Sequence, residues 1–199
     1  PTTVFSYLWW ITLGFLPSLI WLSFYLRKDS HPEPKALLTK AFLMGIIISP
    51  LAVIFQLIAV QVWSDAFNVL PQIAQREPLI VLWAAFVEEF IKFTAVYLII
   101  VRHPAFDEPV DGMIYMITAA LGFAAMENIL VVFRIIQNPL VANPVNTAVS
   151  TLLLRFTGAT LLHALSSALV GYFLALSLFF QHHSARLIRI GLVLATLFH

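Results

Sequence analysis

Long apolar runs separated by short polar segments make up most of the chain. The runs are continuous rather than alternating, which is typical of membrane-spanning helices and not of barrel strands. A helix needs about 20 apolar residues to cross the hydrocarbon core of a bilayer. Runs of this kind cover about Val4–Leu26, Leu37–Trp63, Leu79–Val101, Gly112–Ile136 and Thr147–Phe180, and a shorter one follows at Leu187–His199. The sequence therefore predicts an all-α, polytopic transmembrane helix bundle of five full spans plus at least part of a sixth.

Three runs have features that refine this prediction. Pro50 lies inside the second run and predicts a kink, because proline removes a helical hydrogen bond. The fifth run is too long for one perpendicular span, so we expect it to tilt, to extend past the bilayer or to bend near Gly158. The last run rises only about 20 Å against a hydrocarbon core of about 30 Å, so we expect the sequence to stop inside a sixth span.

Composition supports a membrane protein. The chain is 61% hydrophobic, with a mean hydropathy of +0.93 and 11% charged residues, against about 25% charged in an average soluble domain. We expect one integral membrane domain over residues 1–199, in contact with the lipid bilayer. The net charge of +1 gives no reason to expect a nucleic-acid partner, and the absence of cysteine excludes disulfides and a thiolate nucleophile.

The distribution of basic residues predicts the orientation. Cytoplasmic loops of membrane proteins carry an excess of Lys and Arg. The ends of the spans divide seven to three, with Arg27, Lys28, Lys35, Lys40, Arg102, Arg186 and Arg189 on one side and Arg76, Arg134 and Arg155 on the other. We therefore expect the N-terminus to lie outside the cell.

Five titratable side chains interrupt the apolar runs: Glu88, Glu89 and Lys92 in the third, Glu127 in the fourth and His163 in the fifth. A charge at the centre of a span costs about 2.5–3.5 kcal/mol on insertion scales, so such residues indicate a functional site by default. Counted from the outer end of each span, Glu88 is nine residues beyond Leu79, Glu127 nine from Ile136, and His163 eight beyond Arg155, which we interpret as an interfacial anchor. The shared depth of about 12–14 Å predicts one polar site in the outer half of the bilayer.

Spacing and charge point to hydrolysis. Glu88 and Lys92 are four residues apart and share a helix face, and Glu89 is turned away from it. Three carboxylates face one ammonium, and the excess of about two negative charges requires either protons or a bound dication. Water can be activated in two ways. A glutamate can take a proton from it, or a metal held by Glu and His can lower its pKa.

Other hydrolytic centres are excluded by their missing motifs. The chain has neither His-Glu-x-x-His nor Gly-x-Ser-x-Gly. Aspartates occur only in loops or at helix ends, at Asp29, Asp65, Asp107 and Asp111. Glutamate and histidine remain as the candidate chemistry.

The ordered motifs resemble those of the PrsW family of intramembrane proteases. They are Glu88-Glu89-x-x-Lys92, Phe123-x-x-x-Glu127-Asn128 and His163-x-x-x-Ser167, on successive spans, with Asp111-Gly112-x-x-Tyr115 and Arg155 adding to the likeness within a motif core of about 79–172. The resemblance implies a protease of a prokaryotic cell membrane that cuts a membrane-anchored protein substrate. The role it implies is the first cut of an anti-sigma factor in regulated intramembrane proteolysis.

A more distant similarity links the motifs to the CAAX-protease and bacteriocin-processing group. That group has Glu-Glu-x-x-x-Arg, Phe-x-x-x-His and His-x-x-x-Asn, whereas this chain has Lys92, Glu127 and Ser167 at the corresponding places. These departures leave both a metal-free glutamate mechanism and a metal-assisted one open.

We therefore predict catalytic roles for Glu88, Glu89, Glu127 and His163. In this scheme Glu88 or Glu89 takes a proton from water, and Glu127 and His163 position that water or a metal. Lys92 holds the glutamate pair, and Asn128 or Ser167 donates to the oxyanion. A divalent metal such as zinc would be bound by Glu127, His163 and one of Glu88 or Glu89, with Glu89 as the first choice, at about 2.0–2.2 Å.

Two other functions fit the same residues. A secondary transporter or ion carrier would use Glu88, Glu89 and Glu127 to bind a cation or relay protons. A non-catalytic scaffold would use the Glu88–Lys92 pair and a neutral core histidine only for packing. In the same structural interpretation Asp111 is a helix N-cap, and Phe123 and Tyr115 pack in the core.

Overall fold

The computed structural model describes residues 4–28, 31–67, 77–101, 103–179 and 184–199. Every regular element in these ranges is a helix, which confirms the predicted all-α class. The helices are α1 (Val4–Leu26), α2 (Lys35–Phe67), α4 (Glu77–Ile99), α5 (Pro109–Gln137), α6 (Pro144–Thr157), α7 (Ala159–Phe179) and α8 (Ser184–Phe198).

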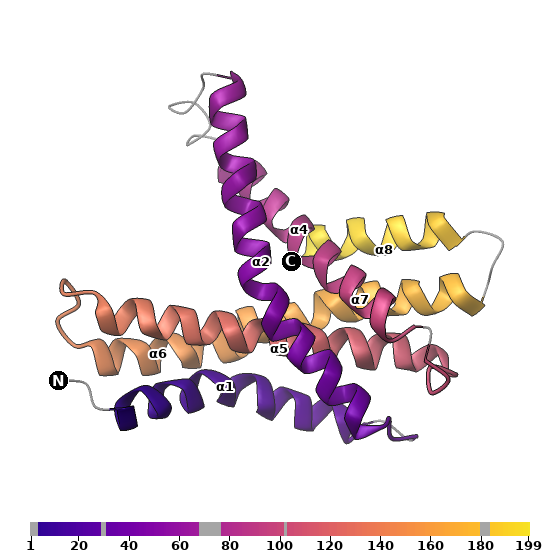
Figure 1. Ribbon diagram of the computed structural model, residues 1–199, viewed down its shortest axis with the longest axis horizontal. Helices are drawn as coiled ribbons and strands as arrows, with labels where there is room; N and C mark the ends of the chain where they lie inside the picture. Colours follow the sequence, from indigo (N-terminus) through magenta and orange to yellow (C-terminus); the bar gives the residue numbers. More distant parts are fainter. Residues whose placement is uncertain (1–3, 29–30, 68–76, 102, 180–183) are drawn as a thin grey trace.

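Helix α5 is the centre of the bundle. Figure 1 shows α1, α5 and the α6–α7 pair running side by side, with α2 crossing them steeply and α8 returning along α7. Helix α5 contacts α1, α2 and α7 extensively, and 72% of its apolar span is buried, against 22% for α1 and 28% for α2. The last residue of the sequence lies in the middle of the molecule, close to α4.

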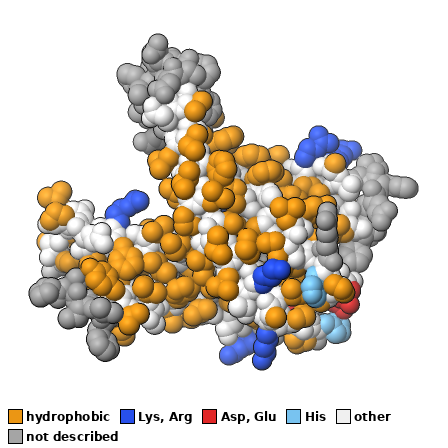
Figure 2. All heavy atoms as spheres, viewed as in Figure 1, with side chains coloured by type: hydrophobic (Ala, Val, Ile, Leu, Met, Phe, Trp, Pro, Cys, Tyr) orange, Lys and Arg blue, Asp and Glu red, His pale blue; other side chains and the backbone are white. Residues whose placement is uncertain are grey.

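The outer surface is apolar, as a lipid-facing protein requires. Hydrophobic side chains cover most of the face in Figure 2, including the part of α2 that projects beyond the other helices. Among the residues that the structure describes, four segments are long and apolar enough to cross a membrane, namely Tyr7–Leu26, Lys35–Ala59, Pro109–Gln137 and Pro144–Leu178. Helix α4 has the length of a span but carries three charged side chains in its middle. The count of five spans and part of a sixth stays a prediction.

Two sequence predictions can be compared with the helix boundaries. The long fifth run is divided into α6 and α7 by a turn at Gly158, the position at which the sequence allowed a bend. Helix α5 begins at Pro109, two residues before the predicted N-cap Asp111. Asp111 still caps the helix, because its Oδ2 accepts the backbone N–H groups of Asp107 and Glu108 from within the first turn.

Glycine lets α2 and α5 touch at the backbone. A Cβ atom added to Gly45 would fall on the carbonyl oxygen of Ala119, and one added to Gly122 would fall on that of Phe42. Close backbone approach through small residues is a common way for membrane helices to associate. The contact fixes the crossing of the two helices, and therefore the place where α2 meets α4.

Replacing Gly122 by alanine is expected to lower the free energy of unfolding by about 1–3 kcal/mol, since backbone atoms of α2 must move to admit the methyl group. Denaturant titration in detergent micelles measures the change. Leu130→Ala, at an exposed position of the same helix, is the control. Equal stability of the Gly122 and Leu130 variants would contradict the packing argument.

Candidate active site

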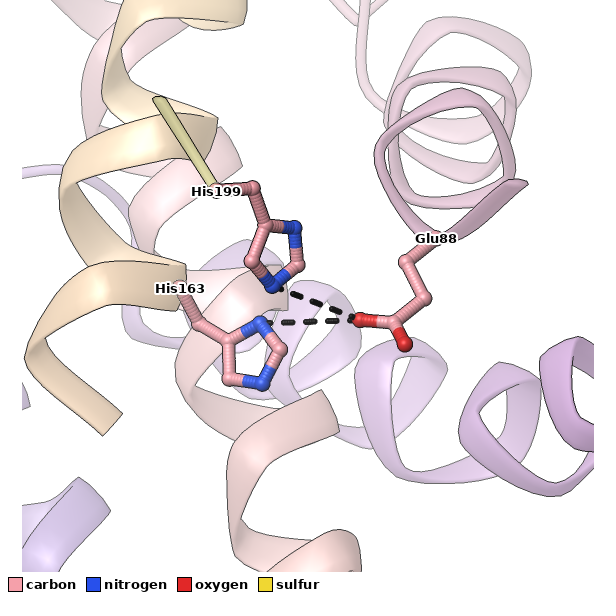
Figure 3. Close-up of side chains that lie close together, drawn as sticks. All are labelled: Glu88, His163 and His199. Atoms are coloured by element: carbon pink, nitrogen blue, oxygen red, sulfur yellow. Dashed lines mark ion pairs between the residues drawn. The ribbon is translucent and has the colours of Figure 1, made fainter. Parts of the chain in front are cut away.

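The polar residues predicted to meet do meet. Glu88, Glu89 and Lys92 project from α4, Glu127 from α5 and His163 from α7. The Oε2 atom of Glu127 lies 2.8 Å from His163 Nε2, and Oε2 of Glu88 lies 3.7 Å from His163 Nδ1 (Figure 3). The predicted proximity is confirmed, whereas the catalytic roles stay predictions.

Glu89 and Lys92 form the buried base of the site. Both side chains are 0% exposed, and the ammonium lies 2.9 Å from Glu89 Oε1. The hydroxyl of Ser167 donates to Glu89 Oε2 at 2.7 Å, and that of Ser166 donates to Oε1 at 3.1 Å. Glu89 is thus fully hydrogen-bonded, and Ser167, predicted as an oxyanion donor, uses its hydroxyl on this carboxylate. Sequence reasoning missed Ser166.

The tautomer of His163 follows from its neighbours. Lys92 Nζ lies 3.0 Å from His163 Nδ1, and an ammonium can only donate, so Nδ1 is the acceptor. The proton of the neutral ring then sits on Nε2, which donates to Glu127. The lone pair of His163 therefore faces the α4 carboxylates. The same ammonium lies 4.4 Å from the centre of the Phe123 ring, which adds a cation–π contact.

The interpretation of Arg155 as an interfacial anchor is wrong. Its Nη2 donates to Glu127 Oε2 at 3.1 Å, and its Nε donates to the Asn128 side-chain oxygen at 2.6 Å. The Asn128 amide in turn donates to the Thr160 hydroxyl at 3.2 Å. Asn128, predicted as an oxyanion donor, is thus fully buried and engaged with α6 and α7.

His199 is a second residue that sequence reasoning missed. Its Nε2 lies 3.6 Å from Glu88 Oε2, its Nδ1 lies 3.3 Å from Glu89 Oε1, and its ring centre is 4.6 Å from that of His163. Figure 3 shows both imidazoles turned toward the same oxygen of Glu88. The sequence contained a signal for it. His163 was selected because it is a histidine in an apolar run, and His199 ends such a run as well.

The charges are closer to balance than the sequence indicated. Three carboxylates, Glu88, Glu89 and Glu127, face two permanent cations, Lys92 and Arg155, when the histidines are neutral. About one negative charge therefore remains. It belongs to Glu88, since Lys92 lies nearer to Glu89 than to Glu88, at 2.9 against 3.8 Å, and Arg155 pairs with Glu127.

Glu88 has one satisfied and one unsatisfied oxygen. Its Oε1 accepts a hydrogen bond from the Gln56 amide at 3.1 Å. Its Oε2 is buried and has no hydrogen-bond donor among the described residues. His199 Nδ1 is also buried and has no hydrogen-bond partner among them. Such unpaired buried atoms are costly unless a ligand, ion or water completes them.

These side chains fit a divalent metal. One ligand atom each from Glu88, His163 and His199 lies within 4.8 Å of the others. Two imidazoles and one carboxylate are a common ligand set of catalytic zinc, which keeps a fourth position for water. Metal-bound histidines usually donate their other nitrogen to a carboxylate, and Glu127 holds this place behind His163. In the predicted set, Glu89 and Glu127 already bind Lys92 and Arg155. His163 Nδ1 likewise accepts from Lys92, so a metal at this nitrogen would take the place of that hydrogen bond.

Comparisons with known proteins identify the family of the chain. A family model described as PrsW family intramembrane metalloprotease matches residues 33–199. The chain is 34% identical to Protease PrsW of Geobacillus kaustophilus over 164 residues, which is 82% of this chain and 64% of that protein. It is 28% identical to Protease PrsW of Halalkalibacterium halodurans and 27% identical to that of Oceanobacillus iheyensis, in each case over 95% of this chain and 79% of the relative. No solved structure matches. The chain therefore belongs to the PrsW family of intramembrane proteases.

Proposed function

We propose that this chain hydrolyses a peptide bond of a membrane-anchored protein substrate, with a divalent metal at Glu88, His163 and His199. The observation that carries the proposal is the buried Oε2 of Glu88, which lacks a hydrogen-bond donor and faces two imidazole nitrogens. Family membership supports the reaction class. An anti-sigma factor is the substrate that the family resemblance implies.

The chain's own residues divide the work of hydrolysis. A bound dication would act as a Lewis acid toward water. Without a metal, Glu88 takes the proton of the attacking water and returns it to the leaving amine, because its Oε2 is unpaired; with a metal bound, the same oxygen would be a ligand. Lys92, which is paired with Glu89, donates to His163 Nδ1. Asn128 binds Arg155 and Ser167 binds Glu89, so neither donates to the oxyanion in this scheme.

An apolar groove beside the site supports a substrate that arrives within the membrane. The groove lies between α4 and α8 and is lined by Leu79, Trp83 and Phe86 on one side and Val193 and Leu197 on the other. Phe86 lies three residues before Glu89, and Thr196, which also lines the groove, lies three residues before His199, so the groove borders the site on both helices. An extended apolar segment of a membrane protein fits such a surface.

The decisive experiment is cleavage of single-span candidate substrates by the purified full chain in liposomes. We expect wild-type activity to be lost with a chelator and restored by zinc, and Glu88→Gln to be inactive. Asp107→Asn, at an exposed loop position, is the matched control. Full activity at a metal content near zero would leave only the glutamate mechanism. Ion flux without cleavage would favour the ion carrier.

The proposed orientation places the N-terminus and the α5–α6 loop outside. The chain has no cysteine, so single cysteines can be labelled without background. In intact cells, Leu140→Cys, in the α5–α6 loop, is expected to react with a membrane-impermeant maleimide, and His31→Cys, between α1 and α2, is expected to react only after lysis. The reverse labelling pattern would invert the topology.

A further inference from the structure

Behind His163, away from Glu88, lies a second layer of polar side chains that the proposed reaction does not use. It consists of Glu127 and Asn128 on α5, Arg155 on α6 and Thr160 on α7. We infer that Arg155 is a positioning residue for His163 and acts through Glu127. The inference rests on the proposed function, because it concerns the histidine that would bind the metal.

The guanidinium holds two neighbours on α5 at once. Its Nη2 reaches Glu127 at 3.1 Å and its Nε reaches Asn128 at 2.6 Å. The planar fork of arginine sets the angle between these two bonds, which a lysine ammonium cannot do. The Asn128 amide donates to the hydroxyl of Thr160 on α7. The guanidinium is therefore linked to α7 through Asn128.

The next step passes from Glu127 to the imidazole. The oxygen that accepts from Arg155, Oε2, also accepts the Nε2 proton of His163 at 2.8 Å. This bond sets the plane of the ring and, together with the Lys92 ammonium at Nδ1, its tautomer, so that Nδ1 is the nitrogen on the side of Glu88. Without Arg155 the carboxylate would lose its partner on α6 and could turn away from the ring.

The burial of these groups makes the arrangement costly to disturb. The side chains of Arg155 and Glu127 are 20% and 23% exposed, and that of His163 is 4% exposed. Water therefore competes poorly for the Arg155–Glu127 pair. An arginine that only anchored α6 at a lipid headgroup would point outward and would not affect metal affinity.

Zinc affinity of the full chain in detergent micelles, measured by competition with a chromophoric chelator, tests the inference. Arg155→Ala is expected to weaken zinc binding and lower kcat by about 10–100-fold, the usual effect of losing an outer partner of a metal ligand. KM should change little. Arg155→Lys should lose less, because it keeps the charge without the second bond. Arg134→Ala, at an exposed position near the end of α5, should match the wild type.

A double variant separates positioning from general stabilisation. If Arg155 acts through Glu127, then Arg155→Ala should cost less than about threefold when Glu127→Gln is already present. Multiplying losses would overturn the inference, and so would wild-type affinity and kcat in Arg155→Ala.

Nitrogen NMR of ¹⁵N-histidine, assigned with His163→Ala, gives a readout that needs neither metal nor activity. The wild type should show His163 protonated on Nε2. Because Lys92 still donates to Nδ1, Arg155→Ala should keep this tautomer, while the Nε2–H resonance shifts and exchanges faster with solvent as its bond to Glu127 weakens. An unchanged Nε2–H resonance would refute the inference even if the protein proved to bind no zinc. Absence of cleavage and zinc binding in the wild type, with the Nε2–H change present, would refute only the proposed function.

Discussion

Replacing Glu88 by glutamine is expected to reduce cleavage by about 10²–10⁴-fold while leaving the melting temperature almost unchanged. Loss of a positioned acid–base group has this magnitude. The amide keeps the size of the carboxyl group and can keep the bond to Gln56, and the oxygen that it alters has no hydrogen-bond donor to lose. Cleavage kinetics and thermal unfolding of the same preparation provide both numbers.

The adjacent glutamate provides the sharpest control. Glu89→Gln changes the same atoms one residue along the helix, but Glu89 is fully buried and bound to Lys92, Ser166 and Ser167. This variant should therefore lose stability as well as activity. Identical behaviour of the two variants would mean that the division between a reactive and a structural carboxylate is wrong.

The second large effect is expected for Lys92→Met, which should lower the free energy of unfolding by about 3–5 kcal/mol. Removing one partner of a buried ion pair strands the other charge. The Lys92 side chain is 0% exposed and also contacts His163 and the face of Phe123, so no water can replace it without repacking. Denaturant titration in micelles measures the loss.

Restoring electrical neutrality tests the cause. The double variant Glu89→Gln/Lys92→Met leaves neither buried charge unpaired, so it should be more stable than Lys92→Met alone. Additive losses in the double variant would show that packing, rather than charge, dominates at this place.

The membrane depth of polar residues was the most informative sequence signal. Glu88, Glu127 and His163 lie on three successive spans, and the rise per residue predicted that they share one layer, although the depth of His163 was counted from Arg155, which is not the anchor that we expected. The argument succeeded because a hydrocarbon environment forces polar groups to gather. It could not assign partners among them, since helix rotation and side-chain direction depend on packing between helices.

Arg155 and His199 show the limits of that argument. Arg155 lies at the depth where arginine usually extends to the headgroups, and nothing in its local sequence indicates that it turns inward to Glu127. His199 follows a run too short to span the bilayer, so its depth could not be counted from an outer end. In both cases the missing information was the path of a neighbouring helix.

Backbone contacts were equally hidden from the sequence. Gly45 and Gly122 are separated by most of α2, the whole of α4 and half of α5, and each contacts the other helix's backbone. A glycine in an apolar run reports that some close approach is allowed but not where the partner lies.

The turn at Gly158 divides α6 from α7, and it has a mechanical consequence. Arg155 lies on one side of the turn and His163 on the other, yet both bind the same oxygen of Glu127, at 3.1 and 2.8 Å. That oxygen therefore couples the two helices across the turn. If α6, which exposes Leu153 and Leu154, rotated about Gly158, either the imidazole would move with it or one of the two hydrogen bonds to Glu127 would break.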